Sequence, residues 1–81
     1  MSKHAKTLEK MRNNPRDWRI DDLVTLASHY QIEIRNEGGS HHVFSHASIA
    51  DAICVPAHRP IKPVYVRLFV ELIDSVKEQQ P

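Results

Sequence analysis

The spacing of apolar residues changes twice along this chain, and these changes constrain its fold most. Residues 21–30 place apolar side chains at the i, i+3, i+4 and i+7 spacing of an amphipathic helix. Residues 32–35 then alternate between apolar and polar side chains, which is the pattern of a half-buried strand. Helical spacing returns in residues 63–77. The sequence therefore predicts helices and strands in separate segments, which is typical of an α+β fold.

Turn and capping residues divide the chain further. Ser2 can cap a first helix, Asn14-Pro15 ends it, and the pair Gly38-Gly39 makes a tight turn. We expect a three-stranded antiparallel sheet with helices on one face, a two-layer sandwich of order α-α-β-β-β-α whose other face is partly exposed. By analogy, this is the topology of double-stranded-RNA-binding domains. The expected helices cover residues 2–13, 21–30 and 63–77, and the expected strands cover residues 32–35, 41–46 and 52–55.

The length of 81 residues predicts one small domain with a thin core. Residues 1–19 are expected to form an N-terminal helical extension, anchored by Trp18, and residues 20–77 the core. In the last helix we expect Val64, Val66 and Val70 to pack on the first helix, with a partner surface as the alternative. The core stripe of that helix is expected to contain Tyr65, Leu68, Phe69, Leu72, Ile73 and Val76.

Composition and charge limit the classes of protein to which the chain can belong. Its single cysteine, Cys54, cannot form an internal disulfide, and no signal peptide or apolar membrane span is visible. We therefore expect a soluble cytoplasmic protein with no membrane partner. Residues 1–20 carry six Lys or Arg and two Asp or Glu, a local charge of +4. Such a basic segment either contacts phosphates or is an ordinary solvated helix face.

Three histidines follow the glycine pair within six residues. Histidine ionises near pH 6.5 in general, so it can give and take protons near neutrality. His41 is a candidate general base for an RNA 2′-hydroxyl, because the glycine turn lets a substrate approach closely. His42 and His46 share a strand face and could ligate a metal, or all three could contact bases and phosphates. Each could also be a half-buried strand residue. No full set of zinc ligands is evident, so we predict neither metal nor cofactor.

A second segment, Val55-Pro56-Ala57-His58-Arg59-Pro60-Ile61-Lys62-Pro63, joins the third strand to the last helix. It places His58, Arg59 and Lys62 near a helix N-terminus, where free N–H groups attract anions. The segment therefore predicts a phosphate pocket. The alternative is a helix entry with ordinary surface charge.

Together, Gly39-Ser40-His41-His42-Val43-Phe44-Ser45-His46, Val55-Pro56-x-His58 and Ile61-Lys62-Pro63-x-x-Val66-Arg67 resemble the HicA family of bacterial toxins. The resemblance covers roughly residues 20–76, and the N-terminal extension resembles a longer subgroup. One departure is Tyr30-Gln31, where many relatives have a glycine after the helix.

The resemblance implies a double-stranded-RNA-binding-domain fold and a ribonuclease that cuts mRNA, neutralised by a HicB-type antitoxin. It assigns catalysis to His41, with His42 as the second candidate, and matches His58 to a second family histidine. Ser40, His58, Arg59, Lys62 and Arg67 are the expected RNA contacts. A non-catalytic RNA-binding module, or a subunit that docks a protein through the last helix, remains an alternative. We expect a monomer or a weak homo-oligomer.

Overall fold

The computed structural model describes residues 3–36 and 38–79, and within them the elements follow the order α-α-β-β-β-α. The predicted α+β class and element order are confirmed. The predicted Ser2 cap lies outside the described residues, and most predicted boundaries differ from the observed ones by one or two positions. The elements are α1 (Lys3–Asn13), α2 (Ile20–His29), β1 (Glu33–Asn36), β2 (His41–Ser45), β3 (Ile53–Pro56) and α3 (Pro63–Gln79).

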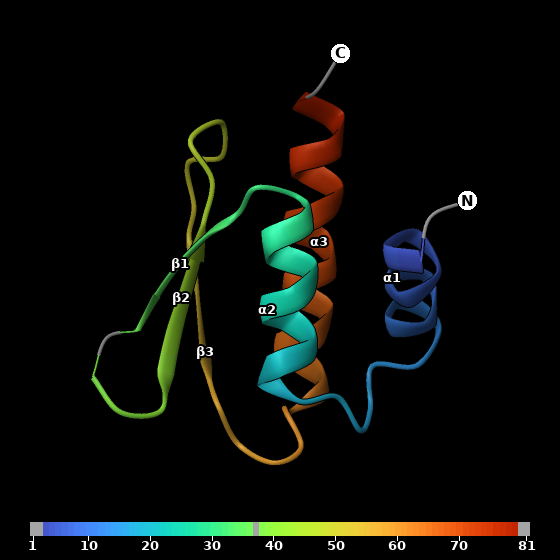
Figure 1. Cartoon of the computed structure of the whole chain (residues 1–81), viewed down its shortest axis with the longest axis vertical. Helices are drawn as coiled ribbons and strands as arrows, with labels where there is room; N and C mark the ends of the chain where they lie inside the picture. Colours follow the sequence, from blue (N-terminus) through green and yellow to red (C-terminus); the bar gives the residue numbers. More distant parts are fainter. Residues whose placement is uncertain (1–2, 37, 80–81) are drawn as a thin grey trace.

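The sheet is antiparallel with the strand order β1-β2-β3. Phe44 of β2 is fully buried and pairs with Ile34 on one side and Ile53 on the other, so this row faces the helices. Helices α2 and α3 cover that face, and no described element covers the opposite one (Figure 1). We call the uncovered side the open face. Its residues are Glu33, Arg35, His41, Val43, Ser45, Cys54 and Pro56.

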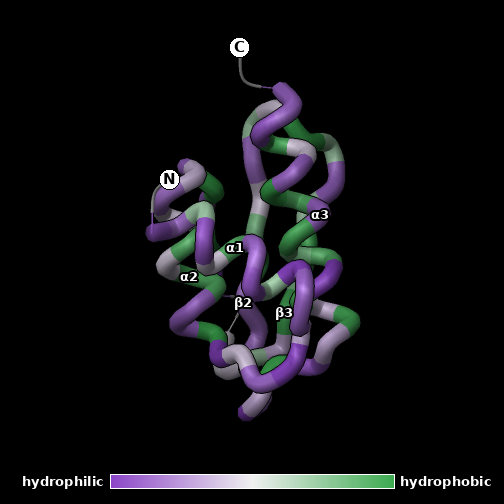
Figure 2. Tube along the Cα trace, turned by 90° about the vertical axis from the view of Figure 1, so that its right-hand side faces the viewer, coloured by the Kyte–Doolittle hydropathy of each residue, from purple (hydrophilic) through white to green (hydrophobic). Residues whose placement is uncertain are grey.

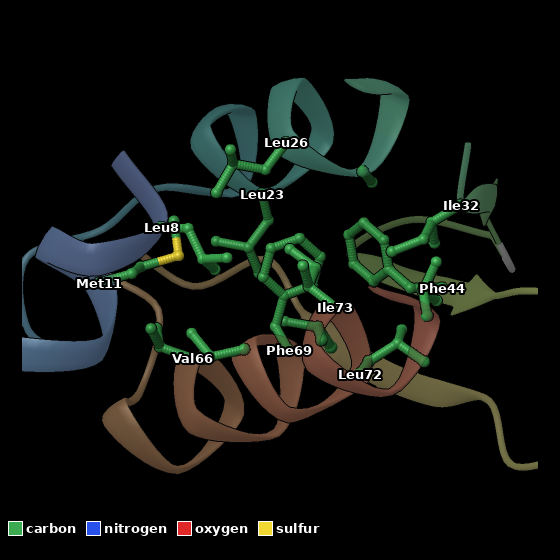
Figure 3. Packing of buried hydrophobic residues seen from close by; sticks show 14 of the residues in the cluster. Leu8, Met11, Leu23, Leu26, Ile32, Phe44, Val66, Phe69, Leu72 and Ile73 are labelled. Atoms are coloured by element: carbon green, nitrogen blue, oxygen red, sulfur yellow. The ribbon is translucent and has the colours of Figure 1, made fainter. Parts of the chain in front are cut away.

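The hydrophobic core fills the space between the helices and the covered face of the sheet (Figure 3). The rings of Phe44 and Phe69 meet edge to face with their centroids 5.2 Å apart, which joins β2 to α3. Leu23 of α2 and Ile73 of α3 are also fully buried. This packing holds the sheet against the helices, so the open face is supported from behind.

Helix α1 packs on α2 and α3, on the side away from the sheet (Figure 1). Leu8 and Met11 are buried in the same hydrophobic core as the apolar residues of α2, α3 and the sheet. Arg12 donates two hydrogen bonds to the carboxylate of Asp74 on α3, at 2.7 and 2.8 Å. These hydrogen bonds hold the pKa of Asp74 below its ordinary value. The N-terminal extension is therefore part of the core rather than a separate arm.

Hydrophobic and hydrophilic residues alternate along α3 (Figure 2), but the buried stripe differs from the predicted one. Val66 and Val70 are buried, as expected if this side packs on α1. The same expectation for Val64 is wrong, because 53% of its surface is exposed. The prediction that Leu68 belongs to the core is wrong, because 40% of its surface is exposed. Tyr65 is only partly buried. The cause is that α3 contacts both the sheet and α1. Its buried side therefore faces the space between these two elements, and residues outside that side are exposed.

None of the helices that the structure describes is both long and apolar enough to cross a membrane.

Candidate functional site

His41 begins β2 and points to the open face. Gly38 and Gly39, with φ of 80° and 77°, occupy the left-handed region that glycine adopts without strain, and they turn the chain into β2. Because side chains alternate along a strand, burial of Phe44 places His42 inward and His41 outward. The His41 side chain is exposed and lies opposite Pro56 of β3. A nucleic acid lying on the open face can therefore reach this imidazole.

The open face also carries a cation, Arg35. Arg35 pairs with Val43, two positions along β2 from His41, so it lies diagonally across the face from the imidazole. Diagonal neighbours across an antiparallel pair are about 7–8 Å apart, within reach of a long side chain. Sequence reasoning did not select Arg35, although the alternation of residues 32–35 already places it outward. Cys54 lies diagonally on the other side of His41 and is exposed.

The segment after β3 is fixed beside the start of β2. The backbone N–H of Ala57 donates to the carbonyl of Ser40 at 2.6 Å, and that of His58 donates to the carbonyl of Pro56 at 2.9 Å. Ser40 and His58 are both exposed. The structure thus brings three predicted site residues, Ser40, His41 and His58, to one end of the sheet.

Arg59 lies in a different setting from the one predicted. With Pro60, Arg19 and Asp17 it lines a cavity of about 320 Å³ between the α1–α2 and β3–α3 connections. The backbone N–H of Ile61 donates to the carbonyl of Trp18 at 2.8 Å and joins these two connections. Neither His58 nor Lys62 lines the cavity. Lys62 is exposed just before α3, and its carbonyl accepts a hydrogen bond from Tyr65.

His42, the second catalytic candidate, lies on the covered face between Asn36 and Val55. It is half-buried, and in the described part of the chain its buried Nδ1 has no hydrogen-bond partner. His41 and His42 therefore cannot replace one another in a reaction on the open face.

His46 was expected on the same strand as His42, and this expectation is wrong, because β2 ends at Ser45. His46 Nδ1 instead accepts hydrogen bonds from the backbone N–H of Ser48 at 3.1 Å and, in one tautomer, from its hydroxyl at 2.8 Å. These bonds stabilise the turn after β2. Across residues 3–36 and 38–79, no group of three His, Cys, Asp or Glu side chains is arranged to hold a metal ion.

Arg67 is not brought to the site. It is exposed on α3, and α3 packs against the covered face of the sheet (Figure 1). The sheet therefore separates Arg67 from His41.

Comparison of the chain with protein-family models, with curated proteins and with solved structures gave no match in any of the three.

Proposed function

We propose that this protein is a metal-independent endoribonuclease that cuts mRNA on its open face, with His41 as general base. The observation that carries the proposal is the exposed imidazole of His41 on a face that no described element covers, with Arg35 diagonally across that face. The exposed side chains of Ser40 and His58 lie at the same end of the sheet. This arrangement combines a proton acceptor with a cation for phosphate, on a surface open to a polymer.

In the proposed reaction, neutral His41 takes the proton of a ribose 2′-hydroxyl. The 2′ oxygen then forms a bond to the adjacent phosphorus, and the bond from phosphorus to the 5′ oxygen breaks. That oxygen takes a proton from water, so the products end in a 2′,3′-cyclic phosphate and a 5′-hydroxyl. A positioned base contributes about 10²–10⁴-fold in rate, and a guanidinium such as Arg35 stabilises the extra negative charge on phosphorus.

Phosphates on either side of the cut are held by cations at the same end of the sheet. Arg59 and Lys62 follow His58 in sequence and are both exposed, so they can contact an RNA that extends beyond His41. Arg67 is left out of the proposed site, because it lies behind the sheet.

A non-catalytic RNA-binding module is the second candidate, and one observation favours it. In the described part of the chain, no side chain makes a hydrogen bond to the His41 ring that would orient it. Catalytic histidines are commonly oriented in this way, whereas a residue that only contacts RNA needs no such partner. This candidate predicts salt-dependent retention of RNA without cleavage.

Incubation of the purified protein with end-labelled mRNA in EDTA separates the two candidates. The nuclease proposal predicts fragments with cyclic phosphate ends from the wild type and from His42→Ala. His41→Ala should bind RNA and leave it intact. Retention of RNA without fragments would support the binding module. Cleavage by His41→Ala at the wild-type rate would remove His41 from the mechanism.

In the cell, the proposed activity is that of a cytoplasmic toxin whose effect a HicB-type antitoxin blocks by covering His41. Induction of the wild type should arrest growth, and induction of His41→Ala should not. Co-expression with a HicB-type antitoxin should restore growth. Arrest by His41→Ala would contradict this part of the proposal.

A further inference from the structure

The cavity lined by Arg19, Arg59, Pro60 and Asp17 lies between two connecting segments and outside the hydrophobic core. Its walls come from two connections that are about 40 residues apart in sequence and are held together by the hydrogen bond from Ile61 to Trp18. The core lies elsewhere, and the four lining side chains all belong to the surface. We call this feature the arginine cavity.

The charged residues around the arginine cavity indicate which kind of ligand it can bind. Two arginines and one aspartate are among the residues that line the arginine cavity, and together they carry a formal charge of +1. Within residues 3–36 and 38–79, neither Arg19 nor Arg59 lies within 4.0 Å of a carboxylate oxygen. By contrast, Arg12 is fully engaged by Glu9 and Asp74. The planar donor fork of arginine matches phosphate oxygens, so two arginines without a carboxylate partner among the described residues favour a phosphate group at this opening.

The position of the cavity connects it to the open face. Arg59 is two residues beyond Ala57, whose N–H bonds to Ser40 next to His41. Two residues span at most about 7 Å, so the backbone of Arg59 lies close to the start of β2. Figure 1 shows the glycine turn, the β3–α3 connection and the α1–α2 connection at the same end of the molecule.

We propose that the arginine cavity binds a backbone phosphate of the RNA strand that passes His41. This inference rests on the proposed function for its ligand, and it adds Arg19, a residue of the N-terminal extension, to the RNA-binding surface. It gives α1 and its connection a role in the site, because their packing places Arg19 in the lining of the same cavity as Arg59. Asp17 limits the affinity, since its carboxylate repels the phosphate.

The test uses a single-stranded 2′-O-methyl RNA, which can bind but cannot be cut through its 2′ position. Arg19→Gln and Arg59→Gln should each weaken binding about three- to tenfold and lower the slope of log affinity against log salt by about 0.7. Asp17→Asn should tighten binding, and asparagine tolerates the left-handed backbone of this position, with φ of 64°. Arg16→Gln, an exposed neighbour outside the cavity, removes the same charge and should change binding less than either cavity variant.

Equal losses in Arg16→Gln and Arg19→Gln would overturn the proposal, and so would weaker binding by Asp17→Asn. Oligonucleotides with and without a 5′-phosphate should bind equally, and millimolar inorganic phosphate should compete only weakly. A requirement for the 5′-phosphate, or strong competition by inorganic phosphate, would replace the backbone assignment with a terminal or free phosphate. Binding is measured here without cleavage. If His41→Ala disproves the nuclease proposal, the binding result therefore still stands. If the cavity variants bind RNA normally, the nuclease proposal is likewise unaffected.

Discussion

At the scale of single residues, the adjacent histidines His41 and His42 lie on opposite faces of the sheet, although their side chains are chemically identical. His41 is exposed on the open face, whereas His42 is half-buried on the covered face with an unpartnered Nδ1. The sequence predicted this split, because alternation along a strand depends only on which neighbour is buried. It did not predict that β2 ends before His46, since that end depends on hydrogen bonds from Ser48 that no periodicity reveals.

Gln31 supplies a prediction about stability. It ends the turn after α2 with φ of 61°, in the left-handed region where glycine is the usual residue. Gln31→Gly should therefore raise the free energy of unfolding by about 1 kcal/mol. Glycine removes the steric cost of a side chain in the left-handed region, and its greater loss of backbone entropy on folding offsets part of that gain. Urea unfolding measures it. Ser28→Gly, in the exposed part of α2, is the matched control and should lower stability by about 0.5–1 kcal/mol. A loss of stability in both variants would contradict the argument.

At the scale of elements, the six segments could be predicted from periodicity, but their edges and contacts could not. β3 includes Pro56, one residue beyond its expected end at residue 55. An edge strand tolerates proline, and β3 is such an edge. The cavity between two connections was also beyond prediction, because it depends on a backbone hydrogen bond between Ile61 and Trp18.

Burial of α1 residues predicts that the N-terminal extension contributes to global stability. Leu8 is 1% exposed in the shared core, so Leu8→Ala should lower the free energy of unfolding by about 2–4 kcal/mol. Val64→Ala, at a side chain that is 53% exposed, should change it by less than about 0.5 kcal/mol. Urea unfolding followed by far-ultraviolet circular dichroism compares them. A similar, small effect of both variants would mean that α1 is an appended arm.

The contact between α1 and α3 makes stability depend on pH. The pKa of Asp74 is lower in the folded protein than its ordinary value, chiefly because Arg12 hydrogen-bonds to the carboxylate. The pair therefore stabilises the fold above about pH 4, and this contribution disappears as the pH falls through the lowered pKa. Both side chains are more than one third exposed, so we expect only about 0.5–1 kcal/mol. The wild type should exceed Asp74→Asn by this amount in urea unfolding at pH 7 and match it near pH 2. A constant difference at both pH values would contradict the assignment.

At the scale of the whole molecule, the described helices α1, α2 and α3 lie on one side of the sheet, and the proposed reaction takes place on the other (Figure 1). The sequence predicted an exposed sheet face but not all of the residues that lie on it. Arg35 and Cys54 join His41 there only through the register of three strands. The chain's single cysteine consequently reports on what covers the open face.

Alkylation of Cys54 by a thiol reagent should therefore slow when RNA is bound. The 2′-O-methyl RNA should protect Cys54 in the wild type and equally in His41→Ala, because binding needs no proton transfer. A chain with Cys54→Ser and a new cysteine at Val64 on α3, Val64→Cys, is the control and should show no protection. Unchanged alkylation of Cys54 in saturating RNA would mean that RNA binds elsewhere.

The most direct test of the central claim is the single-turnover rate of RNA cleavage between pH 5 and pH 8. A histidine base works only in its neutral form, so the wild-type rate should fall as the pH is lowered toward 5. His41→Ala should be slower by about 10²-fold or more at pH 7 and lose this dependence, while His42→Ala keeps it. A flat wild-type profile, or a His41→Ala profile equal to that of the wild type, would contradict the claim that His41 is the base.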